Sequence, residues 1–240
     1  MGFNGENAHV VGSPWMVFDI ETCPMPSCGE YLTDAIEAPS NYKDPAKIAA
    51  YIEEKRAKQI ADAGLDLDLC EIVAIGWALP DAEVYAQTRE TTSEADMLSG
   101  FWRFVQAVQR DSGNLVGFNC LSFDLPILLR RSLYLGIPTP KVHLDKYRHE
   151  GVIDVASVLT FDGRMTWRSL SFYAKRFGIP HDDSVKGEQI AQLVADGKWA
   201  DVAAHVRSDV ATTAALAQRI GLIYQPTAAE IDAADAMAVA

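Results

Sequence analysis

The sequence predicts an α/β domain in which helices flank a mixed β-sheet and a helical insertion follows the first strand. An apolar strand, WMVFDIE, occupies residues 15–21. Two apolar segments, 71–79 and 82–88, surround a Pro-Asp turn and predict an antiparallel hairpin. One further short strand lies between amphipathic helices, and the last third is mostly helical. This order differs from the strict alternation of strand and helix that gives a purely parallel sheet.

The first strand is followed by a segment of different composition. Pro24 and Pro26 end the strand, because proline cannot donate to a sheet. In the segment 27–70, the stretch NYKDPAKIAAYIEEKRAKQIADAGL has a proline at a helix start, good helix formers, and Gly64 as a stop. At about 40 residues this segment is too long for a plain loop, and we expect a helical insertion.

The remaining elements follow from apolar periodicity and capping residues. Helices are predicted over 93–110, 124–136, 168–177 and 186–223, the last broken near Gly197, and a short strand over 114–119. The segment 152–159 is ambiguous between strand and helix. We expect flexible ends over 1–14 and 225–240. Residues 15–224 would then form a single domain.

Composition excludes several classes of protein. The 240 residues are 49% apolar and 22% charged, as in an ordinary globular protein. No apolar run reaches the roughly 18 residues of a membrane span, and the first residues lack the basic and apolar regions of a secretory signal. The four cysteines are scattered and form no CxxC pair. Reduced thiols, a cytoplasmic location and no membrane contact are therefore expected.

The charge of the chain is unevenly distributed. The net charge of −12 argues against a protein that simply coats nucleic acid, which would be basic. Between Arg130 and Lys186, however, ten Lys and Arg face six Asp and Glu. This excess indicates a local anion-binding face. The alternative is that these charges only solvate helix surfaces.

The first strand carries two acids on one face. Asp19 and Glu21 lie two residues apart, so their carboxylates project from the same side of the strand. Carboxylates about 6–7 Å apart repel each other, so a cation between them or a bound proton is expected. A second Asp-x-Glu pair, Asp81 and Glu83, lies in the hairpin turn, where both acids can face water.

Two later motifs add further acids. Asp124 follows the short strand 114–119 at the start of a helix, where an Asp could equally serve as N-cap. In HVRSD, His205 and Asp209 stand at positions i and i+4 of a long helix and share one face. A lone pair of this kind is usually a surface pair.

Together these motifs predict a metal site. If Asp19, Glu21, Asp124 and Asp209 converge, they hold about four negative charges, which only divalent cations would make tolerable. Oxygen ligands favour Mg²⁺ or Mn²⁺. Two such ions about 3.5–4 Å apart form the clamp used for in-line displacement at phosphodiesters. We therefore expect two divalent ions as cofactors.

Three segments resemble the motifs of DEDD-type 3′–5′ exonucleases: DIET (19–22), NCLSFD (119–124) and HVRSD (205–209). The closer likeness is to the proofreading exonuclease domain of family-B DNA polymerases and to its stand-alone relatives in bacteria and phages. The resemblance implies an RNase H-like fold, a bacterial or phage-infected cytoplasm, and hydrolysis of nucleic acid from a 3′ end. The products would be 5′-mononucleotides.

The resemblance also implies roles for individual residues. His205 would take or orient the proton of the attacking water, and the four acids would bind the metals. Thr22, Asn119 and Phe123 would contact the terminal nucleotides, although Phe123 could equally be a core residue. Candidates for contacts to backbone phosphates are Arg164 and Arg168, together with Arg130, Arg131, Lys175 and Arg176.

The third motif departs from the family pattern. Members have either a tyrosine with three residues before the last Asp or a histidine with four. Here His205 has three, so a histidine stands in the place of the tyrosine. A rival pair, His149 and Asp154, has four residues between its members, but Gly151 disfavours a helix there. Asp154 is kept as a secondary site residue.

Two other functions stay open at this point. An exoribonuclease of the same superfamily would share these motifs, and no residue identifies a partner for the 2′-OH. A non-catalytic module that binds nucleic acid or protein is the second alternative. Four mutually repelling acids argue against it. The sequence does not identify any replication or repair partner.

Overall fold

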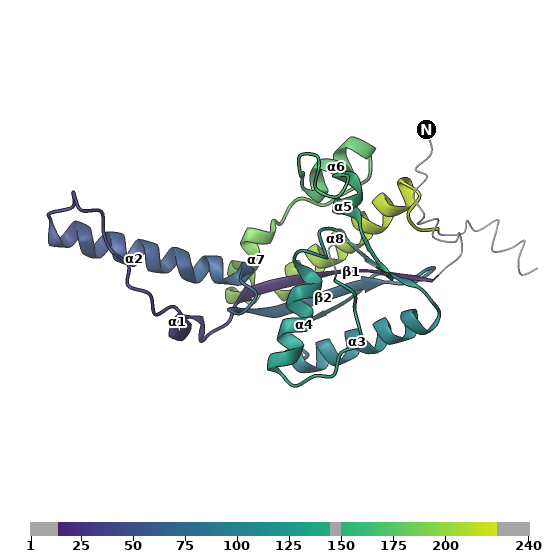
Figure 1. Ribbon diagram of the computed structural model, residues 1–240, viewed down its shortest axis with the longest axis horizontal. Helices are drawn as coiled ribbons and strands as arrows, with labels where there is room; N and C mark the ends of the chain where they lie inside the picture. The colour runs from purple at the N-terminus through teal and green to yellow at the C-terminus, as the bar shows by residue number, and fades with distance from the viewer. Residues whose placement is uncertain (1–13, 145–149, 225–240) are drawn as a thin grey trace, which may run out of the picture.

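A five-stranded mixed sheet forms the centre of the protein, whose computed structural model describes residues 14–144 and 150–224 (Figure 1). The strands lie in the order β3-β2-β1-β4-β5. Their bounds are β1 Trp15–Pro24, β2 Cys70–Ala78, β3 Tyr85–Thr88, β4 Asn114–Gly117 and β5 Val152–Asp154. The β1–β2 and β2–β3 pairs are antiparallel, whereas β1–β4 and β4–β5 are parallel. The predicted α/β class with a mixed sheet is confirmed.

Helices cover both faces of this sheet. The bounds are α1 Cys28–Tyr31, α2 Pro45–Asp62, α3 Glu94–Arg110, α4 Asp124–Tyr134, α5 Val155–Leu159, α6 Leu170–Phe177, α7 Ile190–Ala195 and α8 Trp199–Arg219, with 3₁₀ turns η1 Ala63–Leu65 and η2 Gly187–Gln189. Helices α3 and α4 lie on one side, and α8 lies on the other with α5 and α6 (Figure 1). Apart from Pro14, the ends predicted to be flexible lie outside the described residues.

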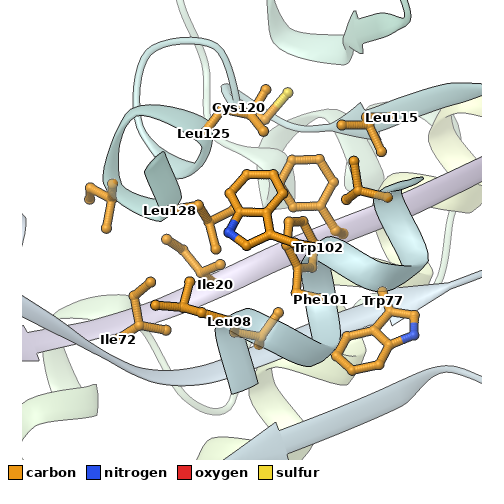
Figure 2. Packing of buried hydrophobic residues seen from close by; sticks show 14 of the residues in the cluster. Ile20, Ile72, Trp77, Leu98, Phe101, Trp102, Leu115, Cys120, Leu125 and Leu128 are labelled. Carbon is orange, nitrogen blue, oxygen red and sulfur yellow. The ribbon is translucent and has the colours of Figure 1, made fainter. Parts of the chain in front are cut away.

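The alternation of side chains along β1 divides the core in two. Phe18 and Ile20 belong to a cluster with Phe101 of α3 and Leu128 of α4, which Figure 2 shows from close by. Trp15 and Val17 instead pack with residues of α8. Because Asp19 and Glu21 have the same parity as Val17, they project toward α8.

A glycine lets α8 lie directly on the strands. Gly76 of β2 is paired with Asp19, and a Cβ at Gly76 would lie 2.9 Å from Val206 Cγ2 and 3.1 Å from Val210 Cγ2. The two valines each follow a residue of the third motif. The absent side chain therefore allows α8 to bring His205 and Asp209 close to the acids of β1.

A buried ion pair ties the helices of the other face together. Arg131 of α4 donates to both carboxylate oxygens of Glu94 of α3, at 2.8 and 2.7 Å. Glu94 also accepts from the backbone N–H of Ile72 at 2.9 Å. The prediction that Arg131 binds phosphate is wrong, because its guanidinium is buried and occupied. Arg130 makes an exposed pair with Asp68.

The segment after β1 forms the predicted helical insertion. Its long helix α2 projects from the body of the protein (Figure 1), and none of its residues is buried. Arg56 holds α2 to the preceding loop by donating to the carbonyl oxygens of Leu32 and Asp34. After α2, where the insertion returns to the sheet, Thr22 Oγ1 of β1 donates to Gly64 O at 2.6 Å.

Local geometry decides one point that the sequence left open. The ambiguous segment 152–159 is a three-residue strand followed directly by the helix α5. The predicted break near Gly197 is confirmed, because Gly197 adopts a left-handed φ of 70° between α7 and α8. Across residues 14–144 and 150–224, no helix combines the length and the apolar character that crossing a membrane requires.

Candidate active site

Strand β1 and helix α8 bring Glu21, His205 and Asp209 together. His205 Nε2 lies 3.5 Å from Glu21 Oε1 and 4.0 Å from Asp209 Oδ2. The side chains of His205 and Glu21 are buried, whereas that of Asp209 is 21% exposed. The pair on α8 is therefore not a surface pair, because the helix turns this face onto the sheet.

Asp124 joins this group from the start of α4. Its Oδ1 accepts from the backbone N–H of Ile20 at 3.2 Å, between Asp19 and Glu21 in the chain. The residue before it, Phe123, occupies the N-cap position and makes no side-chain capping bond. Asp124 is therefore not the N-cap of α4, and its carboxylate is held against β1 by the Ile20 N–H.

The four acids share one electrostatic environment. Burial raises the pKa of Asp19 well above its usual value, and the charges of Asp124, Glu21 and Asp209 raise it further. Glu21 behaves alike: burial first, then Asp209 and Asp124, raise its pKa well above the usual range. Burial raises the pKa of Asp124 and of Asp209 to about 7. The common cause is desolvation without a compensating cation.

In the described part of the chain, no permanent cation neutralises this group. Within the described residues, no Lys or Arg lies at ion-pair distance from Asp19, Glu21, Asp124 or Asp209. His205 is the basic group that touches them, and burial lowers its pKa, with His181 adding to this effect. His205 is therefore neutral near pH 7 and does not compensate negative charge on the acids.

Two buried polar atoms point to something that the chain itself does not supply. In the described part of the chain, His205 Nδ1 and Asp209 Oδ1 are buried without a hydrogen-bond partner. Buried polar atoms in folded proteins are nearly always paired. Orphaned atoms in the middle of an acidic group are what a site for a cation or a water molecule would contain.

The donor set fits a hard divalent cation. Four carboxylates offer oxygen ligands, which Mg²⁺ and Mn²⁺ prefer. Over the described ranges, no three His, Cys, Asp or Glu side chains stand in a ready metal-binding arrangement. The fit therefore rests on the chemistry of the donors, their raised pKa values and the orphaned Asp209 Oδ1.

Asp154, the secondary candidate, has a different environment. Its Oδ1 accepts from the N–H groups of Asn119, Ala156 and Ser157 at 2.9, 3.0 and 3.2 Å. Its Oδ2 accepts from the N–H of Leu121 at 3.1 Å. These four bonds fasten the loop after β4 to β5 and cap α5. Asp154 thus places the loop that leads to Asp124.

That loop is tightly folded. Asn119 has a left-handed φ of 61°. Residue 117 must be a glycine for the loop to fold back this closely, because a Cβ there would lie 2.5 Å from Cys120 Cβ. Of the residues predicted to contact nucleotides, Phe123 is half-buried and packs against the apolar core. Asn119 is also half-buried, and Thr22 is bonded to Gly64.

The remaining candidates make no ion pair with the acids. Arg164 and Arg168 are exposed, in the loop that precedes α6. Arg168 lies over the ring of Phe172, with 5.5 Å from its guanidinium carbon to the ring centroid. The rival His149 lies outside the described residues. Its partner Asp154 is occupied by the four backbone bonds.

The sequence interpretation missed His181 and Thr212. His181 Nδ1 lies 3.0 Å from Thr212 Oγ1, which fastens the segment after α6 to α8. The signal was present, since residues 205, 209 and 212 follow the i, i+4, i+7 spacing of one helix face. Asp182 and Asp183 follow His181 in the chain, and their negative charges raise the pKa of His205, against the effect of burial.

A comparison with known protein families identifies one match. Residues 65–232 match the family described as "Predicted 3'-5' exonuclease related to the exonuclease domain of PolB". The chain belongs to this family. The match includes Asp124, His205 and Asp209 but begins after β1, so Asp19 and Glu21 lie outside it.

A solved structure has the same fold. The family B DNA polymerase from the hyperthermophilic archaeon Pyrobaculum calidifontis superposes with a TM-score of 0.58 and 19% sequence identity. The alignment covers 86% of this chain and 24% of the polymerase, so the chain corresponds to about a quarter of that protein. No curated protein sequence matches the chain. The RNase H-like exonuclease fold inferred from the three motifs is confirmed.

Proposed function

We propose that the protein is a metal-dependent 3′–5′ exonuclease that hydrolyses phosphodiester bonds of nucleic acid, preferably single-stranded DNA, and releases 5′-mononucleotides. The observation that carries this proposal is the uncompensated group of four acids around a neutral histidine. A group that only stabilised the fold would be paired, because unpaired buried charge is costly. The family provides the reaction class.

In this proposal Asp19, Glu21, Asp124 and Asp209 would hold two divalent ions, Mg²⁺ or Mn²⁺. Bound there, such ions activate water for attack on the phosphorus atom and stabilise the leaving 3′ oxygen. Without the ions, the raised pKa values of the four acids favour bound protons. Cation binding is thus coupled to proton release from these carboxyls.

His205 would act as the general base. Its ring is neutral near pH 7 because burial lowers its pKa, so a ring nitrogen can accept a proton. Nε2 faces Glu21 and Asp209, while Nδ1 has no partner among the described residues. Glu21 and Asp209 are placed to stabilise the imidazolium that forms when His205 takes the proton.

The nucleic acid would be held by the elements around the acids. Asn119, Phe123 and Thr22 remain our candidates for the terminal nucleotides, although the half-buried Phe123 also packs on the core. Arg164 and Arg168 remain candidates for backbone phosphates, because both are exposed. A cytoplasmic location and a replication or repair partner stay predictions.

A labelled-strand digestion tests the proposal. Single-stranded DNA and RNA of one sequence, each labelled at the 5′ end, would be incubated with Mg²⁺, with Mn²⁺ or with EDTA. We expect a ladder of shortening DNA products with either metal and none with EDTA. Early release of the label as a mononucleotide would mean attack from the 5′ end and would refute the proposal. Faster digestion of RNA would favour the exoribonuclease alternative.

A matched pair of variants locates the activity. Glu21→Gln removes an acid of the buried group, whereas Glu83→Gln removes an exposed acid of the second Asp-x-Glu pair. We expect digestion to be lost in Glu21→Gln and unchanged in Glu83→Gln. Unchanged digestion in Glu21→Gln would place the chemistry elsewhere.

A further inference from the structure

Four aromatic rings form a row that joins the loop after β4 to the helix α6. Trp167 lies 6.3 Å from Phe118 between ring centroids, Phe118 lies 6.2 Å from Tyr173, and Tyr173 lies 5.5 Å from Phe172. The two ends of the row are open to solvent, with Trp167 54% exposed and Phe172 43% exposed. Large exposed rings at both ends of one row are unusual for a surface with no binding role.

Basic side chains are frequent in the segment that carries Trp167, Phe172 and Tyr173, between Asp162 and Asp182. Residues 163–181 contain four Lys and Arg and no Asp or Glu, in a chain with a net charge of −12. Arg164, Lys175 and Arg176 are exposed, and the Arg168 guanidinium lies over the Phe172 ring. Exposed rings among basic side chains are the combination that binds single-stranded nucleic acid, by stacking on bases and neutralising phosphates.

The row is connected to two elements that carry residues of the candidate site. Phe118 directly precedes Asn119, in the loop that leads to Asp124. On the other side, α6 lies above α8 (Figure 1), and His181 after α6 is bonded to Thr212 of α8. An open cavity of about 400 Å³ lies between Phe172 and His181, lined also by Lys175 and Asp183. A strand on the aromatic row could therefore continue to the acids of β1 and α8.

We propose that Arg164, Trp167, Arg168 and Phe172 form a stacking platform for unpaired bases, so that the protein selects single-stranded nucleic acid before any chemistry. This inference rests on the proposed function, because the platform would lead a strand to the candidate active site. Its test does not, because binding is measured without hydrolysis. Stacking requires a free face of the base, which a duplex hides. The platform thus supplies a physical reason for a single-strand preference, because the acids themselves cannot distinguish paired from unpaired strands.

Binding without hydrolysis tests the platform. Fluorescence anisotropy in EDTA would compare a 16-nucleotide oligothymidylate with an abasic strand of equal length, which keeps the phosphates and lacks the bases. Stacking contributes about 1–3 kcal/mol per base, or roughly 5- to 150-fold in affinity. We expect the wild type to bind oligothymidylate at least tenfold more tightly than the abasic strand. Quenching of tryptophan fluorescence should accompany binding of the strand with bases only.

Variants separate stacking from charge. Trp167→Ala and Phe172→Ala should each weaken binding of oligothymidylate about tenfold and leave the abasic strand unaffected. Arg164→Ala should weaken both strands and flatten the salt dependence. Tyr85→Ala is the matched control, because Tyr85 is 49% exposed on β3, at the opposite edge of the sheet. Trp167→Phe should restore most of the binding that Trp167→Ala loses.

The outcome distinguishes the platform from the catalytic proposal. Hydrolysis of thymidine 5′-p-nitrophenyl phosphate, which is too small to reach the platform, should be lost in Asp209→Asn and kept in Trp167→Ala. Oligothymidylate binding that depends on Trp167 in a protein without hydrolysis would refute the proposed function and leave the platform intact. Equal binding of both strands by the wild type would overturn the platform. A dimer that Trp167→Ala dissociates, with unchanged oligothymidylate affinity, would overturn it as well.

Discussion

Buried acids occur in this protein in two very different settings. Glu94 and Asp154 are fully partnered: Glu94 binds Arg131 and the N–H of Ile72, and Asp154 accepts four backbone N–H bonds. The acids of the candidate site have one backbone bond to Asp124, a neutral histidine, and each other. The first setting stabilises the fold. The second costs stability and therefore calls for a ligand.

The pKa values reflect the same difference. Burial raises the pKa of Asp124 and Asp209 to about 7 and that of Asp19 and Glu21 well above their usual values. Side chains with strongly shifted pKa values cluster at functional sites, because catalysis and metal binding require such side chains and folding does not. Substitution of an acid in the candidate site should therefore reduce activity, whereas substitution of a partnered acid should reduce stability.

The largest effect is expected for Asp209→Asn. Loss of a metal ligand removes several kcal/mol of transition-state stabilisation, so the rate of hydrolysis should fall on the order of 10³-fold or more. The melting temperature should stay level or rise, since one repelling charge is removed. Digestion rates and thermal melts of the purified variant would measure both. A folded variant with full activity would contradict the metal-ligand role.

A smaller loss of rate is expected for His205→Ala, about 10²-fold, at the lower end of the range for a general base. Because burial lowers the His205 pKa, its ring is neutral over pH 7–8 and the loss should be the same throughout. His205→Tyr should recover part of the rate, since tyrosine occupies this position in related enzymes. Rates measured at several pH values would check this. A fully active His205→Ala protein would make His205 a packing residue.

Asp154→Ala should affect stability instead. The substitution removes the acceptor of one buried and three partly buried N–H groups, at about 1–3 kcal/mol for each donor that no water satisfies. We expect the free energy of unfolding to fall by about 2–4 kcal/mol in urea titrations. Activity of the folded fraction should fall far less than in Asp209→Asn. A stable but inactive Asp154→Ala protein would place Asp154 among the catalytic residues.

The metal-free protein should also show a pH dependence of its stability. The folded-state pKa of Asp124, about 7, lies above the value of about 3.9 in an unfolded chain. Between these values the folded protein holds a proton that the unfolded chain has released. Raising the pH from about 4 to about 7 therefore lowers the free energy of unfolding. Above pH 7 the contribution of Asp124 to this free energy no longer changes with pH.

Asp124→Asn isolates this contribution. Asparagine keeps the acceptor for the Ile20 N–H and does not titrate. In EDTA, the stability of the variant relative to wild type should increase between pH 4 and pH 7, as urea titrations would show. A difference that does not change with pH would mean that Asp124 is not buried among other acids.

The sequence predicts the outline of the fold better than its short elements. Strand β1, the hairpin and the helices around residues 93–110 and 199–219 follow from long apolar patterns. The segment 152–159 stayed ambiguous because a three-residue strand and a five-residue helix are both too short to show a period. The residue that joins them, Asp154, has its partners as far away as Asn119.

The candidate site shows the same limit. The parity of Asp19 and Glu21 and the spacing of His205 and Asp209 predict which residues share a face. Whether two faces meet depends on Gly76, whose importance only the packing of α8 reveals. Arg131 was misassigned because its partner Glu94 lies 37 residues earlier and belongs to another helix.

Direct titration of Mn²⁺ into EDTA-treated, desalted protein, without nucleic acid, tests the contrast between the two settings most directly. Calorimetry should give saturable binding to the wild type, and the melting temperature should rise with the ion. Asp209→Asn should lose most of this binding, while Glu83→Gln should bind as the wild type does. Equal Mn²⁺ binding by Asp209→Asn and wild type would contradict the account, because the unpartnered acids would then not be a cation site.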